Sequence, residues 1–125
     1  MFSWFKKLES STGQLGEQLA KQEYKKQGFT IIGSNIFNRK GKQLGEIDFI
    51  ATYKNKICFV EVKTRSQKIG KFGSGVDAVG FAKQQKLLKA VKLFLNQYKK
   101  YQEFQPQIDV CVIELSELDK TLKNV

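Results

Sequence analysis

Two β-type segments joined by a very short connection constrain the fold of this chain most strongly. Leu44–Tyr53 and Ile57–Arg65 are rich in β-branched and aromatic residues, and only the polar residues Lys54–Lys56 separate them. A connection this short joins antiparallel neighbours. The sequence therefore predicts a β-hairpin, and a two-residue loop follows if Tyr53 faces Lys56.

The remaining segments extend this hairpin into an α+β domain. The sequence predicts a helix from Thr12 to Gly28, a strand at Phe29–Phe37, a long helix from Val76 to about Tyr101 and a last strand at Ile108–Leu115. The first three strands would form an antiparallel meander, whereas the continuous apolar run of the last strand is typical of a strand covered on both faces. The order α-β-β-β-α-β predicts a single domain over residues 1–125.

The charge balance favours an anionic partner. The chain carries 22 basic and 12 acidic residues, a formal charge of +10, and no histidine. Nucleic acid or an acidic membrane surface would suit such a chain, although the charge could also serve only solubility. The absence of histidine excludes Ser–His–Asp and Cys–His catalysis and His-ligated zinc, so any catalysis must use carboxylates, lysine or tyrosine.

Three features predict a cytoplasmic protein. The apolar runs are too short for a membrane-spanning helix, and residues 1–11 lack the apolar stretch of a signal peptide. Cys58 and Cys111 lie in separate β segments without metal-ligand spacing, which predicts reduced thiols. Residues 1–11 form a short amphipathic tail that docks on its own domain or touches a membrane or a partner.

The hairpin register brings charged residues onto one face. With the two-residue loop, Asp48 lies opposite Glu61, and Lys63 shares their face. Directly opposed side chains have Cβ atoms about 4.5–5.5 Å apart, so two carboxylates there repel each other unless a cation lies between them. A divalent cation would resolve this repulsion. The alternatives are a solvated polar face with an ordinary Glu46–Lys63 ion pair, or a three-residue loop that sends Asp48 to the other face.

One residue on each predicted helix has two interpretations. Glu17 lies beside a stripe of mostly small residues on the first helix, where it either leans toward the hairpin or remains solvated. Lys83 lies on the apolar face of the long helix. Either its stem extends over the edge of the core, or its ammonium group reaches a phosphate near the hairpin.

Several short motifs resemble those of the YraN family of small bacterial proteins, and together they extend over most of the chain. That family is assigned to the restriction-endonuclease-like superfamily, which is named for its PD-(D/E)xK motif. The resemblance implies a three-layer core with a mixed sheet flanked by helices, and Ile47 stands where the motif has proline. The matching residues are Gly16-Glu17, Gly45-Glu46-Ile47-Asp48, Phe59–Arg65, Phe72-Gly73, Lys83 and Ile108-Asp109-Val110.

The same resemblance implies a Mg²⁺- or Mn²⁺-dependent endonuclease that hydrolyses phosphodiester bonds in structured or branched DNA. Asp48 and Glu61 would hold the metal with the Val62 carbonyl and Glu17, while Lys63 would orient the attacking water. Basic residues would position the backbone phosphates in a sequence-independent manner. These are Arg65, Lys68, Lys71 and Lys83.

Two other functions stay open at this point. The first is a non-catalytic nucleic-acid-binding module that keeps the nuclease fold. The second is a membrane- or protein-docking adaptor that uses the aromatic residues Phe2, Trp4 and Phe5 of the tail. The sequence also leaves open the form of the nucleic acid and whether the chain forms a homodimer.

Overall fold

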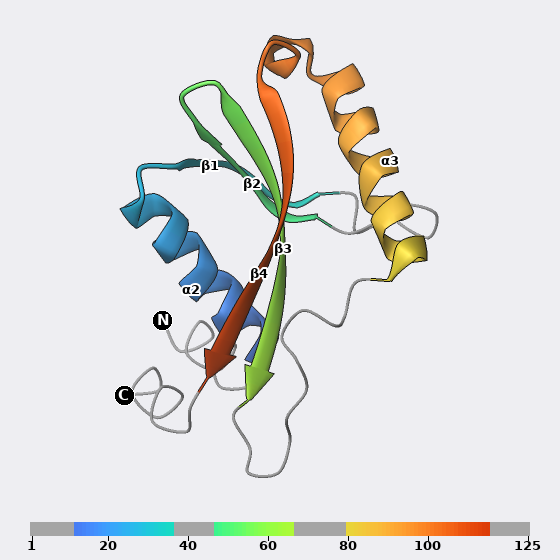
Figure 1. Ribbon diagram of the computed structural model, residues 1–125. Helices are drawn as coiled ribbons and strands as arrows, with labels where there is room; N and C mark the ends of the chain where they lie inside the picture. Colours follow the sequence, from blue (N-terminus) through green and yellow to red (C-terminus); the bar gives the residue numbers. More distant parts are fainter. Residues whose placement is uncertain (1–11, 37–46, 67–79, 116–125) are drawn as a thin grey trace.

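The computed structural model describes residues 12–36, 47–66 and 80–115, and these form one sheet with a helix on each face (Figure 1). The order of elements is α-β-β-β-α-β, so the predicted α+β fold is confirmed. None of the described helices is long and apolar enough to cross a membrane. The elements are α2 (Thr12–Lys26), β1 (Thr30–Ile36), β2 (Ile47–Tyr53), β3 (Lys56–Ser66), α3 (Phe81–Gln97), the short 3₁₀ helix η1 (Lys99–Tyr101) and β4 (Gln105–Leu115).

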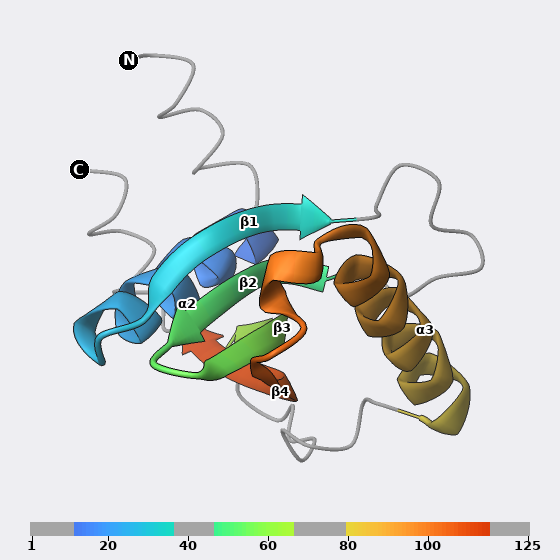
Figure 2. The same cartoon turned by 90° about the horizontal axis from the view of Figure 1, so that it is seen from above.

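The sheet is mixed, with the strand order β1-β2-β3-β4 (Figure 2). The first three strands are antiparallel, which confirms the predicted meander, and β4 runs parallel to β3. Tyr53 pairs with Lys56, so the predicted two-residue loop is also confirmed. Lys54 opens this loop with a φ of 54°, the left-handed conformation that the first loop residue of a tight hairpin requires.

Alternation along the strands divides the core into two layers. Ile50 and Phe59 point toward α3 and pack with its buried Leu87 and Phe94. On the other face, Phe49, Ala51, Cys58 and Val60 pack with Ala20 of α2. The helical spacing of the apolar residues in α3 predicts this burial. Tyr98 lies just beyond the end of α3, so its side chain remains 50% exposed, and its ring is tilted by 38° against the ring of Phe94.

Helix α2 approaches the sheet closely at Gly16. A Cβ atom at this position would lie 1.9 Å from the Thr64 Oγ1 atom of β3. Glycine at position 16 therefore sets the distance between α2 and the sheet, as the stripe of small residues in this helix predicts.

A polar contact fixes the other end of α2 to β4. The Tyr24 hydroxyl donates a 2.7 Å hydrogen bond to Asp109 Oδ2, and Gln107 donates to Oδ1 of the same carboxylate. Burial, together with the bond to Asp109, raises the pKa of Tyr24. Burial also raises the pKa of the nearby Cys58 thiol to about 11. Both cysteines are free thiols, and Cys58 is buried while Cys111 is half-buried, in line with the predicted reduced thiols.

Strand β4 differs from its prediction. Its apolar run predicts cover on both faces, but Ile108 is 36% exposed and Val110 is 38% exposed. The side chains that pack with α3 in the described core come from the first three strands and not from β4. The prediction is therefore wrong for the face of β4 that lies on the α3 side of the sheet.

Candidate active site

The site centres on Glu61, the one charged or polar residue that is buried among the described residues, at 7% exposed. It lies on β3 and points to the face that α3 covers. Its Oε2 atom forms an ion pair with Lys83 of α3 and lies 3.9 Å from the Lys63 Nζ atom. Its Oε1 atom is buried without a hydrogen-bond partner in the described part of the chain. A buried carboxylate oxygen without a partner is costly, so it favours a further cation or donor at this position.

Asp48 lies opposite Glu61, at the point where β2 and β3 stop pairing. The last pair of the ladder is Phe49 with Val60, and the next position along each strand is Asp48 and Glu61. Asp48 Oδ2 accepts a 2.6 Å hydrogen bond from the Val62 N–H group. The carboxylate of Asp48 thus takes the place of a strand partner for this N–H group.

The Val62 carbonyl lies on the same side of β3 as this hydrogen bond. In an antiparallel pair, the N–H and C=O groups of one residue point to the same neighbouring strand. Because the Val62 N–H group reaches Asp48, its carbonyl also points toward β2, beyond the last pair of the ladder. The carbonyl oxygen is therefore placed to join the two carboxylates as a third oxygen donor.

Lys83 is part of the same cluster. It comes from the first turn of α3 and bonds to Glu61, while Asp48 and Lys63 also act on its ammonium group. The hydrogen bond to Glu61 raises the pKa of Lys83, although partial burial opposes this effect. Lys83 therefore neutralises Glu61 from the helix side. The position of Lys83 on the apolar face of α3 indicated from the sequence that this lysine has a special role. Neither interpretation of the sequence named Glu61 as its partner.

The structure does not join Glu17 to this cluster. Glu17 lies on α2, which packs on the opposite face of the sheet, and its ion pair in the described chain is with Lys21 at 3.3 Å. Arg65 lies on β3 two residues beyond Lys63 and is half-buried. Several other predicted positions, including Glu46, Lys68 and Lys71, lie outside the described residues.

The oxygen donors at this site fit a magnesium-type cation. Among the described residues, no group of three acidic, cysteine or histidine side chains gathers in one place. Mg²⁺ is commonly held by one or two carboxylates and keeps several of its waters, whereas structural zinc needs four protein ligands. This site offers the two carboxylates of Asp48 and Glu61, together with the Val62 carbonyl, as oxygen ligands of the kind that Mg²⁺ needs. The Oε1 atom of Glu61 has no hydrogen-bond partner in the described residues.

The fold and this cluster define a small α+β protein with paired carboxylates and lysines on one sheet face. A model of the uncharacterised protein family UPF0102 matches residues 16–113, a span that includes every described residue of the cluster. The chain belongs to this family, which confirms the resemblance to the YraN proteins.

Relatives from several bacteria share most of the chain. It is 40% identical over 121 residues to UPF0102 protein TTE1452 of Caldanaerobacter subterraneus subsp. tengcongensis, covering 96% of this chain and 93% of the relative. It is 38% identical over 117 residues to UPF0102 protein CLJ_B2665 of Clostridium botulinum, covering 90% of each chain. It is 36% identical over 102 residues to UPF0102 protein ABAYE2669 of Acinetobacter baumannii, covering 82% of this chain and 72% of the relative.

Proposed function

We propose that this chain is a Mg²⁺- or Mn²⁺-dependent nuclease that hydrolyses phosphodiester bonds, with its metal site at Asp48 and Glu61. The observation that carries the proposal is the buried and unpartnered Oε1 atom of Glu61, with a second carboxylate, Asp48, one position beyond the last pair of the β2–β3 ladder. The resemblance to the PD-(D/E)xK motif assigns the same residues to the same roles. Glu17 as a further ligand stays a prediction.

Each residue of the cluster has a separate task in this proposal. Asp48, Glu61 and the Val62 carbonyl hold the cation. When bound, the cation supplies Lewis acidity toward the phosphate and lowers the pKa of a coordinated water. Lys63 orients the attacking water and offsets the negative charge that develops in the transition state. Lys83 holds Glu61 in place and adds positive charge where a phosphate would enter.

The basic surface of helix α3 suits a nucleic-acid backbone. Helix α3 contains no acidic residue, and its side chains Lys86, Lys89 and Lys92 are exposed. Lysines placed in this way bind phosphates rather than base edges, so they favour recognition of nucleic-acid shape over recognition of sequence. Structured or branched DNA is therefore the proposed substrate, and Arg65, Lys68 and Lys71 are the further proposed phosphate contacts.

One observation favours a second candidate, a nucleic-acid-binding module without turnover. Lys83 already neutralises the Oε2 atom of Glu61, so the cluster has a balanced ion pair before any metal binds. A binding module would keep this ion pair as a structural contact between α3 and the sheet. The two functions differ in whether the bound nucleic acid is cut.

The deciding experiment incubates the purified protein with linear, flapped and four-way DNA and with RNA, in Mg²⁺, Mn²⁺ or EDTA. We expect cleavage of at least one branched DNA with Mg²⁺ or Mn²⁺, no cleavage with EDTA, and no cleavage by Asp48→Asn with Mg²⁺. Binding that weakens with salt, without cleavage in any metal, would instead support the binding module.

Metal binding also has a readout that does not depend on activity. Mg²⁺ or Mn²⁺ at ten times its dissociation constant should stabilise the wild type by about 1.4 kcal/mol, because it binds only the folded chain. This corresponds to a rise in melting temperature of roughly 3–8 °C for a domain of this size. Calorimetry at constant ionic strength should show a smaller rise for Asp48→Asn. Glu103→Gln, which removes an exposed carboxylate, should respond as the wild type does. An equal rise in Asp48→Asn and wild type would place the metal elsewhere.

A further inference from the structure

Strand β4 is an edge strand of the sheet that the described residues form. It pairs with β3 on one side, and no strand of the described chain pairs with its other side (Figure 2). An edge strand of this length presents a row of main-chain groups that can pair with another strand. The edge is long, because β4 spans the 11 residues Gln105–Leu115.

The register shows which residues of β4 face the open side. The Gln105 N–H group donates to the Asn55 carbonyl, so the main-chain groups of Gln105 point toward the β3 hairpin. The main-chain N–H and C=O groups of successive residues point alternately to the two sides of a strand. The main-chain groups of Ile108, Val110 and Val112 therefore point away from β3. Pro106 also faces outward, and this is the side on which its missing N–H group does no harm.

Beyond Pro106, β4 lacks the lysines that commonly protect an edge strand. Exposed edges commonly carry lysine, yet β4 has two acidic residues and no basic residue in a chain with 22 basic residues. Its outward residues include Ile108 and Val110, which expose apolar side chains. An anionic partner finds no basic side chain on β4 itself, whereas the outward main-chain groups and the apolar side chains of Ile108 and Val110 suit another strand.

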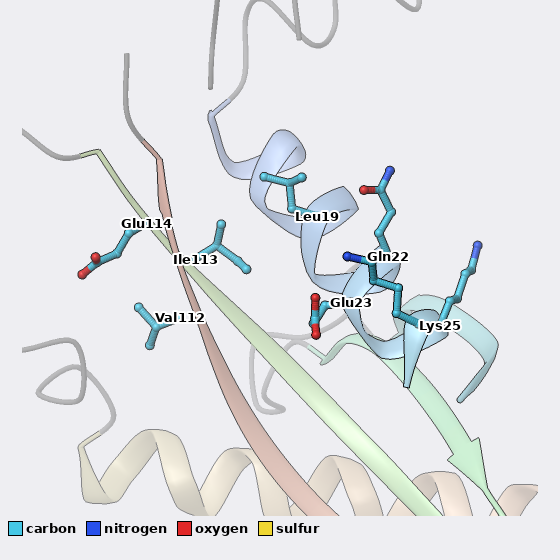
Figure 3. Close-up of a pocket in the computed structure, with 8 residues that line it drawn as sticks. Leu19, Gln22, Glu23, Lys25, Val112, Ile113 and Glu114 are labelled. Atoms are coloured by element: carbon cyan, nitrogen blue, oxygen red, sulfur yellow. The ribbon is translucent and has the colours of Figure 1, made fainter. Parts of the chain in front are cut away.

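A groove runs between this edge and the flank of α2 (Figure 3). Its volume is about 740 Å³, and Leu19 and Ile113 contribute apolar surface from its two walls. Its charged residues are Glu23 and Glu114 together with Lys25 and Lys26, so both signs are present in equal number. A surface that carries both signs can meet its own copy without net repulsion.

We propose that β4 and this groove form a homodimer interface, in which β4 of one copy pairs with β4 of a second copy. The strands run antiparallel, because copies related by a two-fold axis can share main-chain hydrogen bonds only in that direction. The pairing covers Ile108 and Val110 and joins two sheets into one. This inference does not depend on the proposed nuclease activity.

Sedimentation equilibrium of the full chain tests the proposal. We expect a concentration-dependent dimer for the wild type. Val110→Lys should raise the dissociation constant of the dimer about 100-fold or more, because the interface would then bury two ammonium groups, one from each copy. Leu93→Lys is the matched control, since Leu93 on α3 is also 38% exposed, and its dimer should dissociate as the wild type does.

Hydrogen exchange of the wild type keeps the test independent of whether Val110→Lys folds. The Ile108, Val110 and Val112 amides should become more protected as concentration rises, in step with the dimer fraction. A monomer at all concentrations would overturn the proposal. A dimer that survives in folded Val110→Lys would place the interface elsewhere and would also overturn it. Protection of these amides in the monomer would mean that another segment of the same chain covers the edge, and it would also overturn the proposal.

Discussion

A Lys63→Ala variant should cut nucleic acid roughly 10²-fold or more slowly than the wild type, the loss expected when a positioned charge or proton-transfer group is removed. Lys63 lies 3.9 Å from the Glu61 Oε2 atom and is half-buried on the same strand. The substitution leaves both carboxylates and the Lys83–Glu61 ion pair in place. Its effect should therefore appear in the single-turnover cleavage rate with saturating metal.

Nucleic-acid binding by Lys63→Ala should change much less than cleavage. Lys63 is one of 22 basic residues, and the loss of one phosphate contact lowers the salt dependence of binding by about one unit of slope. Binding isotherms at several salt concentrations measure this directly. Excess Mn²⁺ should partly restore Asp48→Asn, which weakens metal binding, but should not restore Lys63→Ala.

Lys56→Ala is the matched control for this experiment. Lys56 is exposed at the start of the same strand, so its removal changes the net charge equally without touching the cluster. It should cut at the wild-type rate. If Lys63→Ala also cuts at that rate, the activity belongs to another site and the assignment of the hairpin is wrong.

Gly16→Ala should lower the free energy of unfolding by about 1–3 kcal/mol, although alanine is the better helix former. The new methyl group would overlap the Thr64 side chain at 1.9 Å, so α2 or β3 must shift. Urea unfolding followed by circular dichroism measures the change. Gly13→Ala serves as the control, because Gly13 is exposed on the same helix and its replacement should not destabilise the fold.

A double-mutant cycle separates this overlap from a general effect on the helix. Thr64→Ala removes the Oγ1 and Cγ2 atoms that the methyl group would meet first, at 1.9 and 2.8 Å. The double variant should therefore lose less stability than the sum of the two single variants. Relief should be partial, since the Cβ atom of residue 64 would still lie 2.9 Å away. Additive losses would show that close packing at Gly16 is not the cause.

The sequence predicts the hairpin and its face well because both depend on local rules. The short connection sets the register, and the two-residue period then places Asp48, Glu61 and Lys63 on one face. The positions of these residues therefore follow from counting along two adjacent strands. The pairing of Tyr53 with Lys56 confirms the register on which that count depends.

Every contact that the local rules fail to predict joins elements that are far apart in the chain. Lys83 meets Glu61 because α3 packs on the same face as the hairpin acids, and no periodicity within α3 specifies that face. The side of the sheet on which α2 packs is also a tertiary property, so the sequence of α2 alone does not place Glu17 relative to the hairpin acids. The exposure of Ile108 likewise depends on how far α3 extends over the sheet, which the apolar run in β4 does not encode.

The hydrogen bond from Val62 to Asp48 links the proposed chemistry to the architecture of the hairpin. Functional residues often reduce stability, yet here the carboxylate ends the strand ladder and satisfies a main-chain donor. Asp48→Asn keeps an acceptor oxygen and tests charge, whereas Asp48→Ala would also fray the hairpin end. A substitution that abolishes activity would therefore destabilise the fold less at Lys63 than at Asp48. Inactive descendants of such a chain should retain the aspartate longer than the lysine.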